Sequence, residues 1–325
     1  MEKQDCKKYT YGNNVKEYDT MNHDNETQQF DFYKYRGTGK CVSEGISFIT
    51  DNFVTLLFLT SPISIPLAVI ISTIIYNISI SQNLHSLDSI IINISFIVIA
   101  LLVVSSFESA IFNIIKKKSD NIDIKVIKFS DLYTSLGNSI SKTFTFNIIL
   151  IGIFVISYVL CSSIYTFFSE NTLINILMIG LFAIVLIVTI INIIPLTLSL
   201  PWIVLGEDNF IKSIINGYKH GMKHIGKLFS LNLIIIIITL LLLLLLMAPT
   251  IVIFMIYHSI TVSKIVGDNI LIPDYFDIYA FIIILITVIM FDILLLLYLV
   301  PTAYMYASIK FDIIEEENNN LPIVL

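Results

Sequence analysis

Six long apolar segments alternate with polar intervals along the chain. The segments are 53–80, 89–115, 144–168, 172–205, 229–257 and 278–306. Each is longer than the roughly 20 residues that an α-helix needs to cross the hydrocarbon core of a bilayer. The pattern therefore predicts an all-α fold, a polytopic integral membrane bundle of six transmembrane helices.

The basic residues lie on one side of this alternation. Seven Lys or Arg residues precede the first segment, six lie in 116–143, four in 206–228 and one in the C-terminal tail, whereas the other three connections hold only Lys264. Positive charge accumulates in the loops that stay in the cytoplasm. We therefore expect a multi-pass protein of a cell membrane, with both termini in the cytoplasm.

The two ends of the chain are polar. Residues 1–42 contain five tyrosines among amide and charged side chains. They show no sustained apolar periodicity, so we expect a disordered cytoplasmic arm. Residues 43–314 form the predicted membrane domain, and 315–325 a short acidic cytoplasmic tail.

Two basic intervals carry amphipathic sequence that predicts cytoplasmic elbow helices lying in the membrane interface. After Glu207, an apolar stripe recurs at helical spacing: Ile211, Ile214, Ile215, Tyr218, Met222, Ile225 and Phe229. An adjoining stripe holds Lys212, Lys219, Lys223 and Lys227, which we expect to bind anionic lipid headgroups. Interval 129–144 carries a shorter version. Gly217 and Gly221 form a G-x-x-x-G pattern that allows close helix approach.

The elbows match each other at an offset of 85 residues. Tyr133 pairs with Tyr218, Lys142 with Lys227, Phe144 with Phe229, and Asn147 with Asn232; a further step back reaches Phe48. These matches indicate three units, each an elbow followed by a transmembrane hairpin. Coincidence in a chain rich in Ile and Lys stays open as the alternative, because the even-numbered spans do not align at this offset.

Asp292 is an acidic residue deep in the last segment. It lies about 14 residues into that segment, or roughly 21 Å along a helix, among apolar neighbours such as Val288 and Leu295. An ionised carboxylate is costly there, so we expect it to face the bundle and to be paired or protonated. Two interpretations stay open: a proton or cation relay, and a neutral Asp that pins helix packing.

Other polar residues lie closer to the basic intervals. Glu108 precedes Lys116 by eight residues, about 12 Å along a helix, and Asn192 lies in the inner half of the fourth segment. We group both with Asp292 as a candidate ligand or proton relay. Asn147 and Asn232 begin two spans, and we expect them to bond across packed helices.

Composition and motifs exclude several classes of function. The chain is 56% hydrophobic and 14% charged, against roughly a quarter charged in soluble domains. It contains no G-x-S-x-G, H-E-x-x-H or phosphate-binding Gly-rich loop, so we expect no enzyme activity, catalytic residue or cofactor. His220 and His224 lie four apart without further ligands beside them, so no metal site is expected. Nucleic acid is not an expected partner, because the basic runs are short and membrane-adjacent.

Two stretches resemble a group of six-span membrane families. In residues 200–219 a proline-containing span end meets an acidic turn and an amphipathic helix, a likeness carried by Pro201, Gly206, Ser213 and Gly217. Residues 300–312 resemble the end of the same families. They include the membrane domain of glycerophosphoryl diester phosphodiesterases and prokaryotic membrane proteins of uncharacterised function. The resemblance covers roughly 43–314 and implies a six-helix membrane fold without catalytic residues; the phosphodiesterase's soluble catalytic domain has no counterpart here.

Two functions fit these observations. The leading hypothesis is a non-enzymatic membrane protein that transports or holds a small or lipid-like ligand, based on Asp292, Glu108 and the proline-interrupted spans. The alternative is an accessory or scaffold protein that binds lipid headgroups or partner proteins, including other membrane proteins or further copies of itself. In that case the lysines of the third elbow would matter more than Asp292.

Overall fold

The computed structural model describes residues 32–319 except 81–86, 169–171 and 267–274, and all regular structure in this part of the chain is helical. The helices are α1 (Thr38–Asp51), α2 (Phe53–Ile80), α3 (Leu87–Ser119), the 3-10 turn η1 (Ile124–Val126), α4 (Phe129–Phe168), α5 (Thr172–Leu196), α6 (Ser199–Leu205), α7 (Phe210–Lys223), α8 (Ile225–Val266) and α9 (Phe276–Asn319). Six of the segments are long and apolar enough to cross a membrane. The predicted all-α, multi-pass membrane fold is confirmed.

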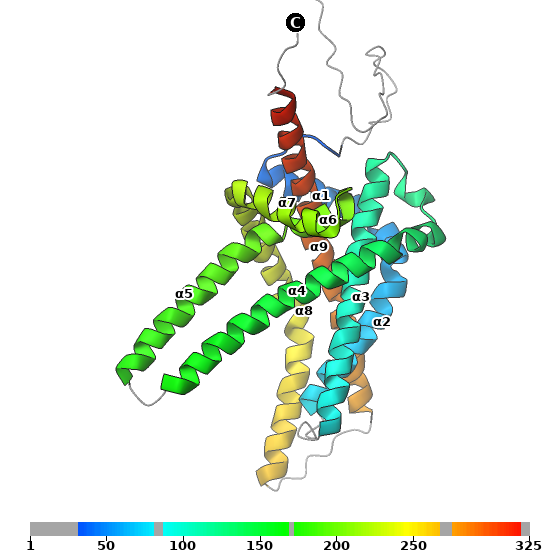
Figure 1. Cartoon of the computed structure of the whole chain (residues 1–325). Helices are drawn as coiled ribbons and strands as arrows, with labels where there is room; N and C mark the ends of the chain where they lie inside the picture. The colour runs from blue at the N-terminus through cyan, green and yellow to red at the C-terminus, as the bar shows by residue number, and fades with distance from the viewer. Residues whose placement is uncertain (1–31, 81–86, 169–171, 267–274, 320–325) are drawn as a thin grey trace, which may run out of the picture.

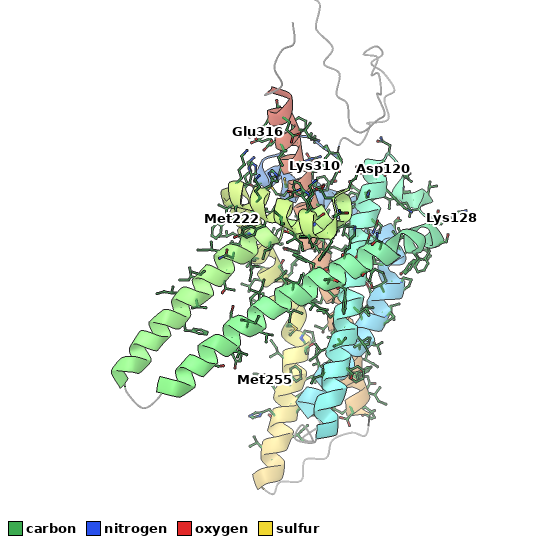
Figure 2. All side chains as sticks on the ribbon, viewed as in Figure 1. Asp120, Lys128, Met222, Met255, Lys310 and Glu316 are labelled. Carbon is green, nitrogen blue, oxygen red and sulfur yellow. The ribbon has the colours of Figure 1, made fainter. Side chains whose placement is uncertain are left out.

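The spans divide into a four-helix group and a diverging hairpin. Helices α2, α3, α8 and α9 run side by side, whereas α4 and α5 splay away from them as a pair (Figure 1). Helices α1, α6 and α7 and the α3–α4 connection gather at one end, which we call the basic end. Lys128, Lys310 and Glu316 lie toward this end, and Met255 lies along α8 away from it (Figure 2).

The first and third elbows are near-copies of each other. Helices α1 and α7 each have 14 residues, and Thr38 and Phe210, like Asp51 and Lys223, are 172 residues apart. One residue then breaks each helix from the following span. The second elbow differs from expectation: 129–144 is the continuous start of α4, although Gly137 and Asn138 lie at the position that matches the breaks at Asn52 and His224.

Each elbow packs on the basic end of an even-numbered span. The start of α4 packs on α3, α7 packs on α5 and α6, and α1 packs on α9. Small residues make two of these contacts close. A Cβ atom on Gly217 would lie 2.5 Å from Ser199 Cα, and one on Gly45 would lie 2.9 Å from Pro301 Cγ. This cyclic arrangement agrees with a three-unit repeat whose first-to-third register is 172 residues, not the expected 170.

The predicted disordered arm is ordered from Phe32 onward, and residues 1–31 lie outside the described part of the chain. Arg36 is only 1% exposed. Its Nη1 donates to Phe32 O at 2.6 Å, its Nε to Glu44 at 2.7 Å, and its guanidinium lies 4.9 Å from the Tyr304 ring centroid. This cluster fixes the segment before α1 against α9. Composition could not reveal it, because the partner helix is more than 250 residues away.

The predicted acidic tail also begins inside a helix. Helix α9 continues to Asn319, and the Glu316 carboxylate pairs with Lys223 Nζ at 2.6 Å. The ion pair and the helical backbone hydrogen bonds hold residues 315–319 in the helix, although their polarity predicts a solvent-exposed tail. Residues 320–325 lie outside the described part of the chain.

Gly217→Ala should destabilise the protein by about 1–3 kcal/mol, because the new methyl group overlaps the α6 backbone. Gly152→Ala is the matched control: it lies in the interior of α4 with nothing within 4 Å of the added Cβ, so helix propensity predicts an unchanged or higher stability. Thermal unfolding in detergent micelles measures both. Equal melting temperatures for the two variants would contradict the close α6–α7 contact.

Docking of α1 on α9 should become weaker in alkaline solution. Burial raises the pKa of the Cys41 thiol from its ordinary value to about 11. Between pH 9 and about 11 the thiol is ionised in the unfolded chain but still protonated in the folded protein. The free energy of unfolding therefore falls as pH rises through that range. Alkylation of a variant whose other two cysteines are Ser should be slow until α1 undocks. Alkylation of Cys41 at neutral pH as fast as that of the protein unfolded in denaturant would contradict the burial of this thiol.

Candidate functional site

A groove runs along α3 on the side where α4 diverges. Its volume is about 360 Å³, and it is lined by Ile74 of α2, by Ile97, Ala100, Leu101, Val104 and Glu108 of α3, and by Asn147 and Ile151 of α4. Six of these eight residues are apolar. Glu108 and Asn147 form its polar end, which is the end closer to the basic end of the molecule.

The polar end is built by three hydrogen-bonding positions on α3 that face α4. Ser105, Glu108 and Ser109 follow the i, i+3, i+4 spacing of one helix face. Asn147 Nδ2 donates to Glu108 Oε2 at 2.7 Å and to Ser105 Oγ at 3.0 Å. Ser109 Oγ donates to Thr143 Oγ1 at 2.9 Å. The Glu108 carboxyl group is thus fixed in place, with Asn147 bonded to one oxygen.

Tyr298 of α9 also lies within electrostatic reach of Glu108, and Thr197, which follows α5, is a polar neighbour of its hydroxyl group. Sequence reasoning missed this residue. The sequence feature that could have identified it is that Tyr298 is the one side chain with a hydroxyl group in the apolar run 293–300. Because Tyr298 belongs to α9, it connects the groove's polar end to the last span.

The structure does not bring the three proposed relay residues together. Asp292 is buried between α9 and α2, next to Ser64, and it does not line the groove. Asn192 is exposed on α5, where its Oδ1 accepts a hydrogen bond from the Tyr218 hydroxyl at 2.8 Å. Glu108 therefore shares the groove with Asn147, not with Asp292 or Asn192.

The two asparagines expected to pack helices behave differently. Asn147 bonds across from α4 to α3, as described above. Asn232 Nδ2 donates to Leu228 O of its own helix at 2.9 Å. The two residues occupy matching sequence positions, but only the second unit places a serine and a carboxylate opposite the amide.

Two of the predicted headgroup lysines tie the third elbow to the end of α9. Lys223 Nζ lies 2.6 Å from Glu316 Oε2, and Lys227 Nζ lies 2.9 Å from Asp312 Oδ2. Opposite charges on α7, α8 and α9 thus meet at the basic end. Such partly exposed pairs contribute little stability individually, but they orient the helices.

The other two lysines lie on the outer part of α7. Lys212 pairs with Asp208 at 3.1 Å, and the hydrogen bond from Lys212 lowers the pKa of that carboxyl group. Lys219 is exposed, and no ion pair joins it to a described acidic residue. The apolar stripe also faces outward, with Ile211 70% and Ile215 58% exposed. Interfacial lipid is the environment that suits this face.

His220 and His224 lie between α7 and the neighbouring helices. His220 stacks on Trp202, with ring centroids 5.2 Å apart. Burial lowers the pKa of both imidazoles, and the positive charges of nearby lysines add to the effect. The described residues contain no group of three His, Cys, Asp or Glu side chains that could hold a metal ion.

Comparison with known proteins gives no functional assignment, so the fold and the groove are the basis for proposing a function. No protein-family model, curated protein or solved structure matches this chain. The likeness to the membrane domain of glycerophosphoryl diester phosphodiesterases stays a prediction.

Asn147→Ala should destabilise the protein by about 1–3 kcal/mol, because the half-buried Glu108 carboxyl group within the span loses its donor. Asn232→Ala is the matched control and should change stability by at most about 0.5 kcal/mol, since within the described residues Asn232 bonds to its own helix and to no other. Unfolding in mixed micelles measures the difference. Similar losses in both variants would contradict the assigned α3–α4 contact.

Proposed function

We propose that this integral membrane protein holds an amphiphile with an alkyl chain and a hydrogen-bond-donating head, and moves or presents it without covalent chemistry. The observation that carries the proposal is the α3–α4 groove, apolar along its length and ending at Glu108. The alkyl chain lies along Ile97, Leu101 and Val104, and the head lies at Glu108.

The lining explains why an alkyl chain fits. A groove that faces hydrocarbon gains nothing from excluding water, so its occupant is chosen by shape and by polar contacts. The ligand-binding sites of proteins combine apolar walls with a few fixed polar groups that set orientation. Here the groove is open on the side where α4 diverges, and a lipid-like molecule enters it from the bilayer.

The polar end explains why the head is a donor. A carboxyl group accepts hydrogen bonds and, when ionised, attracts a cation. Within the described residues no Lys or Arg forms an ion pair with Glu108, so that charge is left for the ligand to neutralise. An ammonium or hydroxyl head fits this position, whereas a phosphate or fatty-acid carboxylate is repelled.

The basic end faces the cytoplasm of a cell membrane in this proposal. Its lysines supply the charge bias that retains loops on that side during insertion, so both termini lie there. Glu108 then lies within the inner half of the bilayer, within reach of molecules in the inner leaflet.

A second function draws on a separate observation, the outward-facing apolar stripe of α7 beside Lys212 and Lys219. An accessory role predicts that this surface binds anionic headgroups or a partner protein. The pairing of Lys223 and Lys227 with acidic residues of α9 reduces the charge available for it, so we rank this role second.

A photoactivatable long-chain alkylamine should crosslink to 97–108 or 147–151 of the full chain in phosphatidylcholine nanodiscs. Unlabelled alkylamine should compete at least tenfold better than the fatty acid of equal length. Glu108→Gln should weaken binding by about tenfold, because a charge-assisted hydrogen bond becomes neutral. Peptide mass spectrometry locates the crosslink.

Asn192→Ala, on the exposed face of α5, is the matched control and should bind normally. The proposal is wrong if Glu108→Gln binds the alkylamine like wild type, or if the fatty acid competes equally well. Loss of binding to phosphatidylglycerol vesicles in Lys212→Gln/Lys219→Gln, with the groove inert, would support the accessory role.

A further inference from the structure

A buried carboxyl group lies outside the groove, where α9 packs on α2. Asp292 is 4% exposed, and the Ser64 side chain of α2 is the polar group beside its carboxyl group. Among the described residues the carboxyl oxygen Oδ2 of Asp292 is buried without a hydrogen-bond partner. About 24 Å of helix separate it from the start of α9. Asp292 is therefore deep in the span, and at least one of its two carboxyl oxygens lacks a hydrogen bond.

The surroundings offer no compensating charge. Helix α2 has no titratable residue in 53–75, α8 has none in 228–256, and α6 has none. The titratable groups on the remaining contacting helices are Asp88, Glu108 and the terminal lysines of α3, and Lys40, Cys41, Glu44 and Asp51 of α1 at the basic end. On α9 itself Tyr298 is the next such group toward the basic end.

This environment selects the cation that the site can take. A hard metal cation requires about six oxygen ligands, whereas the contacts described at Asp292 supply a carboxyl group and one hydroxyl. A proton needs only the carboxyl group. The protonated carboxyl group can then donate a hydrogen bond to the Ser64 hydroxyl oxygen. We propose that Asp292 is a proton-binding site, and that the bound proton keeps the α2–α9 contact closed.

Helix α2 is weakened at the point that faces this site. Ser64 lies between Pro62 and Pro66, which lack the backbone N–H groups of a regular helix. Ser61 Oγ donates to Phe58 O at 2.9 Å, which replaces the bond that Pro62 cannot make. Loss of the proton leaves a carboxylate that requires water. Helix α2 can bend between the two prolines to admit it.

Helix α9 carries this change to the groove. Tyr298 lies six residues beyond Asp292, about 9 Å along the helix, and is within electrostatic reach of Glu108 on α3, against which α9 packs. A shift of α9 away from α2 therefore alters the polar end of the groove. This step rests on the proposed function, whereas proton binding at Asp292 does not.

Infrared spectroscopy of the full chain in nanodiscs tests proton binding directly. At neutral pH, wild type and Glu108→Gln should show the carbonyl band of a protonated carboxyl group that Asp292→Asn lacks. Ser64→Ala keeps the carboxyl group but removes its hydroxyl partner, so the band should remain and shift. An ionised Asp292 at neutral pH, seen as an unchanged protonated-carboxyl region in Asp292→Asn, would overturn the proposal.

Alkylamine affinity across pH tests the coupling. Wild-type affinity should change by about fivefold or more as Asp292 titrates, whereas Asp292→Asn should bind the amine but lose that part of the pH dependence. Identical pH profiles in both proteins would overturn the coupling. Absence of amine binding in wild type at every pH would overturn the proposed function and leave the infrared result to decide proton binding.

Discussion

The hydrocarbon core of a bilayer contains no water, so every polar atom placed in it must be satisfied by the protein or by a bound molecule. This constraint explains the regular part of the fold, since six apolar helices satisfy their own backbone groups. It also singles out the few side chains that break the pattern. In the described part of the spans, Glu108 is a half-buried acidic residue that is bonded to Asn147, and Asp292 is a buried one whose Oδ2 has no hydrogen-bond partner.

The elbows determine where the groove forms. Helices α1 and α7 cross the spans closely because Gly45 and Gly217 have no side chain at the contact. The second elbow runs straight into its span without a break, so α4 leaves the basic end at an angle and carries α5 with it (Figure 1). The resulting divergence exposes the apolar face of α3. One local difference between repeat units thus creates the surface on which a ligand can bind.

The spans and elbows were predictable because they depend on the polarity of neighbouring residues. Glu108 and Asn147 were also identified, but their contact depends on the facing of two helices, which a hydrophobic pattern does not define. Asn192 shows the same limit, since its depth was compatible with the groove but its face was not. The burial of Arg36 could not be predicted from sequence, because Tyr304 and Ser308 become its neighbours only after α9 returns to the basic end.

The central claim is that a lipid-like molecule occupies the α3–α4 groove with its head at Glu108. A cryo-electron microscopy map of the full chain in a lipid nanodisc tests this most directly. The account predicts elongated density along Ile97, Leu101 and Val104 that ends in contact with the Glu108 carboxyl group. A map in which α4 and α5 close against α3 and α8, leaving no groove at Glu108, would contradict it.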